Sequence, residues 1–228
     1  MVDNNPATRQ GWTIPILVSL AILLPQFLPL ASRSGTTAGA TAGAISTEWL
    51  ANGMIQSLSQ VMLLAVIIGV SGRSREFGVH KPRPRDTPMA TLIFGAMLLI
   101  GSTFTLIATT LGFAPNKTSS GAPGQTSWTM VALSAGFALA SAYREELFYR
   151  VYLLGSFKQR SAPQAAAVAI SVALFAWGHT YQGPSGMAAA ACIGLFLALA
   201  WIKGTSVHAL AWGHAAYNLG ILLTLNTG

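Results

Sequence analysis

The chain has 228 residues, of which 52% are hydrophobic and 8% are charged, and its mean hydropathy is +0.53. Soluble domains carry about 25% charged residues, so this composition excludes a soluble globular protein and indicates an integral membrane protein. The formal net charge of +7 gathers in loops, where it reports membrane orientation. Nucleic-acid binding is excluded because it needs a basic face on a soluble domain.

Seven long apolar runs follow one another along the chain, and long runs predict helices rather than the short alternating strands of a β-barrel. The runs cover residues 11–31, 49–70, 88–113, 128–157, 164–181, 187–202 and 207–225. We therefore expect an all-α, polytopic bundle of about seven transmembrane spans that encloses an intramembrane polar cavity. The first run could be a signal peptide, but its length and weakly basic leader favour an uncleaved span.

Cations are unevenly shared between the loops. They gather between the second and third spans and in the turns after the fourth and sixth: Arg73, Arg75, His80, Lys81, Arg83, Arg85, Lys158, Arg160 and Lys203. Only Arg33 and Lys117 fall on the other side. Because cytoplasmic loops are enriched in Lys and Arg, we expect a cytoplasmic amino terminus and the inner (cell) membrane of a prokaryote. The loop at 73–85 either sets topology alone or also contacts anionic lipid or a substrate.

Polar motifs within the apolar runs divide the chain in two. Residues 1–127 contribute helices and the basic loop, whereas residues 128–228 carry every intramembrane polar motif. Glu145, Glu146 and Arg150 interrupt the fourth run, although the chain has only six acidic residues. Ionised groups at membrane depth are costly and mark functional sites.

The spacing of this charged cluster predicts two different tasks for its neighbouring glutamates. Residues four apart share a helix face, so Glu146 and Arg150 are expected to form a supporting ion pair. Glu145 is turned about 100° from Glu146 on a helix, which leaves it free to act as a general base. The competing interpretation is a purely structural Glu–Arg pair, which leaves Glu145 unexplained.

Histidines occur on two later spans. His179 lies near the end of the fifth run, at a depth similar to that of Glu145 when both are counted from the intervening turn. His214 and Asn218 lie four apart on the last run, and their shared face should point into the bundle. Each motif alone is also compatible with packing or interhelical hydrogen bonding. His208 lies off that face, and we expect it at the membrane interface.

These three blocks, in this order on successive helices, resemble the CPBP family, which comprises type II CAAX prenyl proteases and bacteriocin-processing or Abi-type membrane proteins. The family patterns EExxxR, FxxxH and HxxxN are met by Glu145-Glu146…Arg150, Phe175…His179 and His214…Asn218. The likeness covers about residues 134–222, while the first half of the chain contributes only hydropathy.

The resemblance implies an intramembrane endopeptidase of the glutamic type. Glu145 would activate the attacking water with the help of His179, and His214 and Asn218 would stabilise the oxyanion. The same groups, Glu145, His179 and His214, could instead hold a catalytic zinc ion. The chain lacks the HExxH motif and the glutamic mechanism needs no metal, so we favour a site without a cofactor.

Three functions compete at this point. An endopeptidase would cleave a membrane-presented peptide or protein tail, whether a CAAX-like terminus, a leader peptide or a carboxy-terminal sorting signal. A non-catalytic scaffold or immunity protein would use the same polar residues for structure. A proton-coupled small-solute transporter would use them as a relay, although the chain shows no inverted repeat.

Overall fold

The computed structural model describes residues 11–27, 45–70, 79–112 and 127–227. These residues are almost entirely helical, and none of them forms a β-strand, which confirms the expected all-α class. Several predictions fall on other positions. Arg33, Arg73, Arg75 and Lys117 lie outside the described residues.

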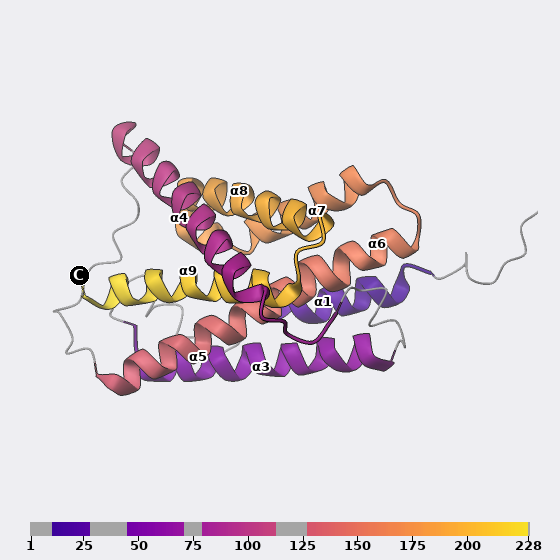
Figure 1. Ribbon diagram of the computed structural model, residues 1–228, viewed down its shortest axis with the longest axis horizontal. Coiled ribbons are helices and arrows are strands. Elements are labelled where there is room, and N and C mark those ends of the chain that lie inside the picture. Colours follow the sequence, from indigo (N-terminus) through magenta and orange to yellow (C-terminus); the bar gives the residue numbers. More distant parts are fainter. Residues whose placement is uncertain (1–10, 28–44, 71–78, 113–126, 228) are drawn as a thin grey trace, which may run out of the picture.

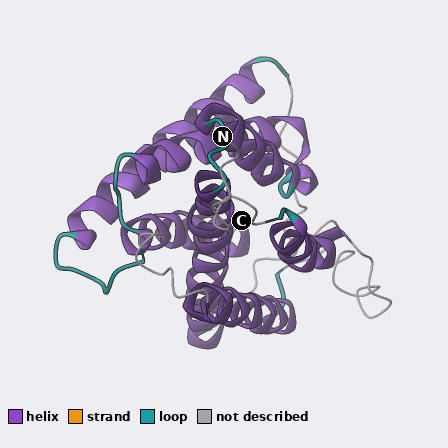
Figure 2. Ribbon diagram, turned by 90° about the vertical axis from the view of Figure 1, so that its right-hand side faces the viewer, coloured by secondary structure: helices purple, strands orange, loops and turns teal. Residues whose placement is uncertain are grey.

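The helices keep the order that the apolar runs predict. They are α1 (Thr13–Phe27), α3 (Thr47–Val70), α4 (Asp86–Thr110), α5 (Trp128–Glu145), η3 (Glu146–Leu154), α6 (Gly155–Gln159), α7 (Gln164–Trp177), η4 (Thr180–Gln182), α8 (Gly183–Ile202) and α9 (Val207–Thr227). They form one bundle, in which α3 packs on α5, α9 lies against α4 and α5, and α7 pairs with α8 (Figures 1 and 2).

Three stretches are long and apolar enough to cross a membrane: Thr47–Val70, Asp86–Thr110 and Thr180–Ile202. Two shorter apolar helices cover Thr13–Pro25 and Gln164–Trp177. Large apolar side chains on the outer surfaces are exposed, among them Met62, Val66 and Leu99. Such surfaces suit lipid and not water, so the chain is an integral membrane protein. The count of about seven spans, the division at residue 127 and the cytoplasmic amino terminus stay predictions.

The fourth predicted span is not one continuous α-helix. The α-helical pattern ends at Glu145, gives way to the π-helix η3, and resumes as the short helix α6. Its hydrogen bonds run from i to i+5 in the π segment, an arrangement that is rare and frequent at functional sites. Figure 1 shows α5 and α6 as parts of one long rod. The prediction of a single α-helix over 128–157 was therefore wrong in its middle.

The π-helix is the centre of the core. All nine of its residues are buried, and it contacts α1, α3, α7, α8 and α9. Phe148 and Val151 pack there with Phe175 of α7, Leu197 of α8 and Leu210 of α9. A segment enclosed on every side holds its polar side chains in fixed positions, because each has little room to change rotamer.

Glycine brings α4 and α9 close together beside this core. A Cβ atom added to Gly213 of α9 would lie 2.6 Å from the Ala90 carbonyl oxygen and 2.7 Å from the Ile93 Cβ atom. Small residues at helix crossings allow such close approach inside membranes. The close crossing therefore fixes the position of the next residue, His214, relative to α4.

Candidate active site

Glu146 lies at the start of η3 and is fully buried. The Arg150 Nε atom lies 3.2 Å from Glu146 Oε2, which confirms the predicted ion pair. Arg150 is itself fully buried, and its Nη2 atom donates to the Gly194 carbonyl of α8 at 3.3 Å. Its guanidinium also stands 4.7 Å from the Phe175 ring centroid. The charge is thus compensated by a carboxylate, a carbonyl and an aromatic face.

Glu145 ends α5 and has a different partner. Arg144 Nη2 donates to Glu145 Oε1 at 2.5 Å. The other oxygen, Glu145 Oε2, is buried and has no hydrogen-bond partner within the described part of the chain. The sequence placed Arg144 in the charged cluster but gave no signal for its partner, because adjacent residues do not share a helix face.

His214 of α9 lies between the two glutamates. Its Nδ1 atom is 2.8 Å from Glu146 Oε1, and its Nε2 atom is 3.7 Å from Glu145 Oε2. A carboxylate only accepts hydrogen bonds, so Nδ1 carries the donated proton. This bond fixes the ring and directs Nε2 toward Glu145, at a separation beyond direct hydrogen bonding.

His179 follows the carboxy-terminal end of α7 and is half-buried. Its Nδ1 atom lies 2.7 Å from the Phe175 carbonyl oxygen. The carbonyl must accept, so Nδ1 donates and Nε2 is left for another partner. His179 and His214 both lie beside the Phe175 ring, with their ring centroids 4.6 Å and 6.1 Å from its centroid. Because His214 also approaches Glu145, the two histidines lie on the same side of the core as this carboxylate.

Asn218 and His208 behave differently from each other. Asn218 lies one turn beyond His214 and is half-buried, but among the described residues no hydrogen bond joins it to the cluster. His208 bonds to the Tyr143 hydroxyl at 2.8 Å and to the His80 carbonyl at 2.7 Å. It therefore joins helices and a loop, a role that its position near a turn did not reveal.

Metal binding has no support from the positions of the side chains. In the described ranges, no group of three or more His, Cys, Asp or Glu side chains could hold a metal ion. The Nδ1 atoms of His179 and His214 are engaged in hydrogen bonds, which leaves both Nε2 atoms available. Such bonds are also usual for metal-ligating histidines, so the alternative zinc set of Glu145, His179 and His214 stays a prediction.

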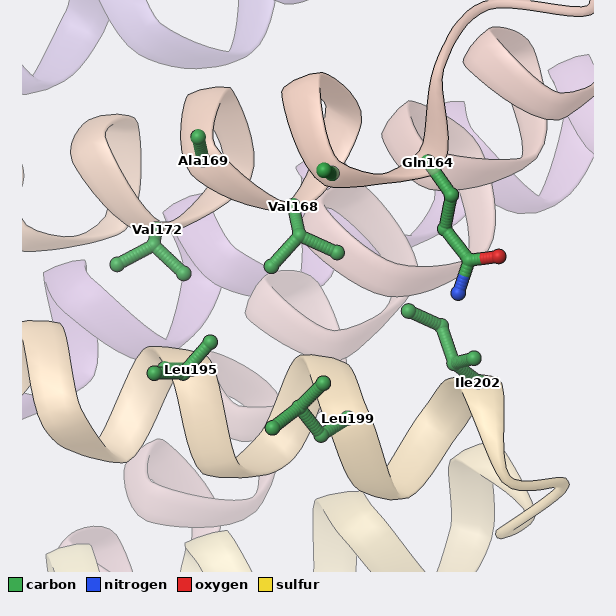
Figure 3. A pocket seen from close by; sticks show the side chains of 8 residues that line it. Gln164, Val168, Ala169, Val172, Leu195, Leu199 and Ile202 are labelled. Carbon is green, nitrogen blue, oxygen red and sulfur yellow. The ribbon is translucent and has the colours of Figure 1, made fainter.

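An apolar groove of about 620 Å³ opens on the surface between α7 and α8 (Figure 3). Its lining consists of Gln164, Ala165, Val168, Ala169, Val172, Leu195, Leu199 and Ile202. None of the predicted site residues contributes to it. The groove is therefore not the predicted polar cavity, which stays a prediction.

Comparison with known proteins matches the second half of the chain to a protein family. No curated protein and no solved structure resembles the chain closely enough to match. The family model described as type II CAAX prenyl endopeptidase Rce1-like matches residues 126–220, a range that holds all three polar motifs. Over residues 126–220, the chain is therefore similar to the Rce1-like family of type II CAAX prenyl endopeptidases.

Proposed function

We propose that the protein is an intramembrane endopeptidase in which Glu145 is the general base. One observation carries this assignment: Glu145 Oε2 is a buried carboxylate oxygen without a hydrogen-bond partner among the described residues. Buried polar atoms are almost always paired, and exceptions often serve catalysis. Glu146 Oε2 likewise has no hydrogen-bond partner there, but it lies 3.2 Å from Arg150 Nε, whereas Glu145 Oε2 lies 3.7 Å from His214 Nε2. Glu145 Oε2 therefore has the looser contact and is the oxygen that we assign to the base.

The cluster suits peptide hydrolysis. Glu145 Oε2 accepts a proton from water while His179 Nε2 orients that water, and the hydroxide oxygen bonds to the substrate carbonyl carbon. Asn218 through its amide N–H, and His214 through Nε2 when both of its ring nitrogens carry protons, stabilise the resulting oxyanion, which is where preorganised donors contribute most to catalysis. The C–N bond then breaks as the proton on Glu145 moves to the leaving nitrogen. The products are one carboxylate and one amine.

The supporting residues hold this geometry. The Arg144 bond to Oε1 leaves Oε2 as the reacting oxygen, and Glu146 orients the His214 ring through Nδ1. The scheme uses no metal, because the glutamic mechanism needs none. The substrate is a membrane-presented peptide or protein tail, and the enzyme acts in the inner membrane of a prokaryote with its amino terminus in the cytoplasm.

Cleavage of a panel of membrane-presented peptides by the purified full chain tests the proposal. The Glu145→Gln variant should lose about 100-fold or more in turnover, the range for removal of a general base. Glu48→Gln is the matched control, because Glu48 is exposed at the start of α3. Equal turnover by wild type and Glu145→Gln would remove Glu145 as the base and favour the scaffold or transporter.

A second arm of this experiment adds a zinc chelator. Turnover by the wild type should be unchanged in its presence. Loss of turnover that is restored by added zinc would replace the glutamic mechanism with a metallopeptidase.

A further inference from the structure

A short basic segment leads into α4 and is exposed along its length. We call residues 80–85, His-Lys-Pro-Arg-Pro-Arg, the basic strap. Lys81, Arg83 and Arg85 are all exposed, and none forms an ion pair with a described residue. Prolines separate the three cations and restrict the backbone to extended or turn conformations. The result is a row of exposed positive charge, without an ion pair to any described residue, on a stiff support.

The first end of the strap is fixed to α5 and α9. The His80 carbonyl accepts a hydrogen bond from His208 Nε2 at 2.7 Å. His208 Nδ1 then accepts from the Tyr143 hydroxyl at 2.8 Å, and that hydroxyl accepts from Trp212 Nε1 at 2.9 Å. Every donor in this chain meets an acceptor. Tyr143 lies two residues before Glu145 on α5, so the strap is bonded to the helix that carries the proposed base.

The second end is fixed through Asp86, the first residue of α4. Asp86 Oδ2 accepts from the Arg83 backbone N–H at 2.7 Å, and Oδ1 accepts from the Ser206 hydroxyl at 2.7 Å. Ser206 in turn accepts from the Ala209 backbone N–H and caps α9. Asp86 is only 3% exposed. Its carboxylate therefore anchors the strap, and among the three strap cations it interacts electrostatically with Arg85.

We infer that the basic strap docks acidic residues of the peptide substrate beside the catalytic helix, an inference that rests on the proposed function. A segment that only attracts anionic lipid needs positive charge close to the membrane surface and no fixed position relative to the catalytic residues. This strap is bonded at both ends to helices that carry Glu145 and His214, which sets its cations at a constant position relative to the cluster. Fixed cations suit a peptide that must be held in register for cleavage.

Binding measurements test the strap without turnover. The full chain carrying Glu145→Gln is placed in phosphatidylcholine nanodiscs and titrated with a fluorescein-labelled, lipid-anchored peptide that bears a run of glutamates. The same peptide with glutamines is the reference probe. The glutamate peptide should bind at least about threefold more tightly, since exposed ion pairs contribute modestly and add over three cations. Raising the salt from about 0.01 M to about 1 M should abolish the difference, because the Debye length falls from about 30 Å to about 3 Å.

Charge variants assign the effect to the strap. The triple change K81Q/R83Q/R85Q should remove the preference, whereas the control K158Q/K203Q, at two exposed cations in other turns, should keep it. Charge reversal, K81E/R83E/R85E, should transfer the preference to a peptide with a run of lysines. Equal binding of both peptides by the parent chain, or a preference that survives the triple change, would overturn the inference.

Lipid is the competing ligand, and nanodiscs that also contain phosphatidylglycerol identify it. The inference would be overturned if the parent chain bound both peptides equally but bound phosphatidylglycerol, and the triple variant no longer bound that lipid. The strap would then be a lipid-binding surface. Because these measurements need no cleavage, they fail independently of the peptidase proposal.

Discussion

At the scale of the residue, two adjacent glutamates have opposite surroundings. Glu146 compensates the fully buried Arg150 at 3.2 Å, whereas Glu145 Oε2 has only the more distant His214 Nε2 atom at 3.7 Å. Removing one partner of a buried ion pair leaves an uncompensated charge and costs about 3–5 kcal/mol. We expect Glu146→Gln to lower the free energy of unfolding by about that amount. Glu145→Gln should change it little, although it abolishes turnover.

Thermal unfolding in detergent micelles, followed by tryptophan fluorescence, would compare these two variants. A similar loss of stability in both would mean that Glu145 is as deeply involved in the fold as Glu146. The comparison is closely matched, because the two changes are chemically identical and occur at neighbouring positions.

Residue identity and spacing predicted part of the site. The Glu146–Arg150 pair followed from four-residue spacing, and the similar depth of Glu145 and His179 was expected from counting residues along the hairpin. The position of His214 between both carboxylates could not be predicted, because it depends on the angle at which α9 crosses η3. Arg144 was missed for a related reason, since its long side chain turns back to the next residue.

At the scale of the element, Gly213 sets the distance between α4 and α9. The change Gly213→Ala would force its Cβ atom against the Ala90 carbonyl, and overpacking costs about 1–3 kcal/mol. Because His214 is the next residue, turnover should fall as well. Gly220→Ala on the same helix is the control, since nothing lies within 4 Å of the added Cβ atom. Unfolding curves and peptide turnover would be measured for both, and an unchanged Gly213→Ala variant would contradict the close crossing.

Helix order was predictable from hydropathy, but helix type was not. The apolar pattern of residues 146–154 does not distinguish hydrogen bonding to i+4 from bonding to i+5, because every side chain in the segment is buried. Packing on all sides decides the outcome, and that information is spread over five other helices.

At the scale of the whole molecule, α8 offers a test of membrane embedding. Cys192, the single cysteine, is exposed on α8 within the candidate span Thr180–Ile202. A charged maleimide should not label it in intact membranes, because the reagent does not enter hydrocarbon and the thiolate is disfavoured there. Labelling should appear after denaturation in sodium dodecyl sulfate.

A second cysteine variant controls for reagent access. Lys203→Cys, in a Cys192→Ser background, lies in the exposed turn after α8 and should react from one side of intact membranes. Rapid labelling of Cys192 in intact membranes would show that this face of α8 meets water.

The all-α fold class and the order of the helices along the chain were predicted from the sequence. Composition alone excluded a soluble protein, and the described helices follow the apolar runs. The number of spans was harder to predict, because a helix of the right length can lie within the bundle or end at mid-depth. The short α7, which ends just before His179, shows how function interrupts the regular pattern.

The π-helix has a consequence for how this chain can change length. In an α-helix, one inserted residue rotates everything beyond it by about 100°, which would turn Glu145 away from His214. A π segment has a wider turn than an α-helix. The side chains of the two α-helices on either side of it therefore need not follow one continuous α-helical register. The face of α5 that meets α3 and the end of α6 that leads into α7 are thus set independently. Because all nine residues of η3 are buried, insertions and deletions of single residues should be tolerated better in the flanking α-helices than within η3, and least beside the two carboxylates.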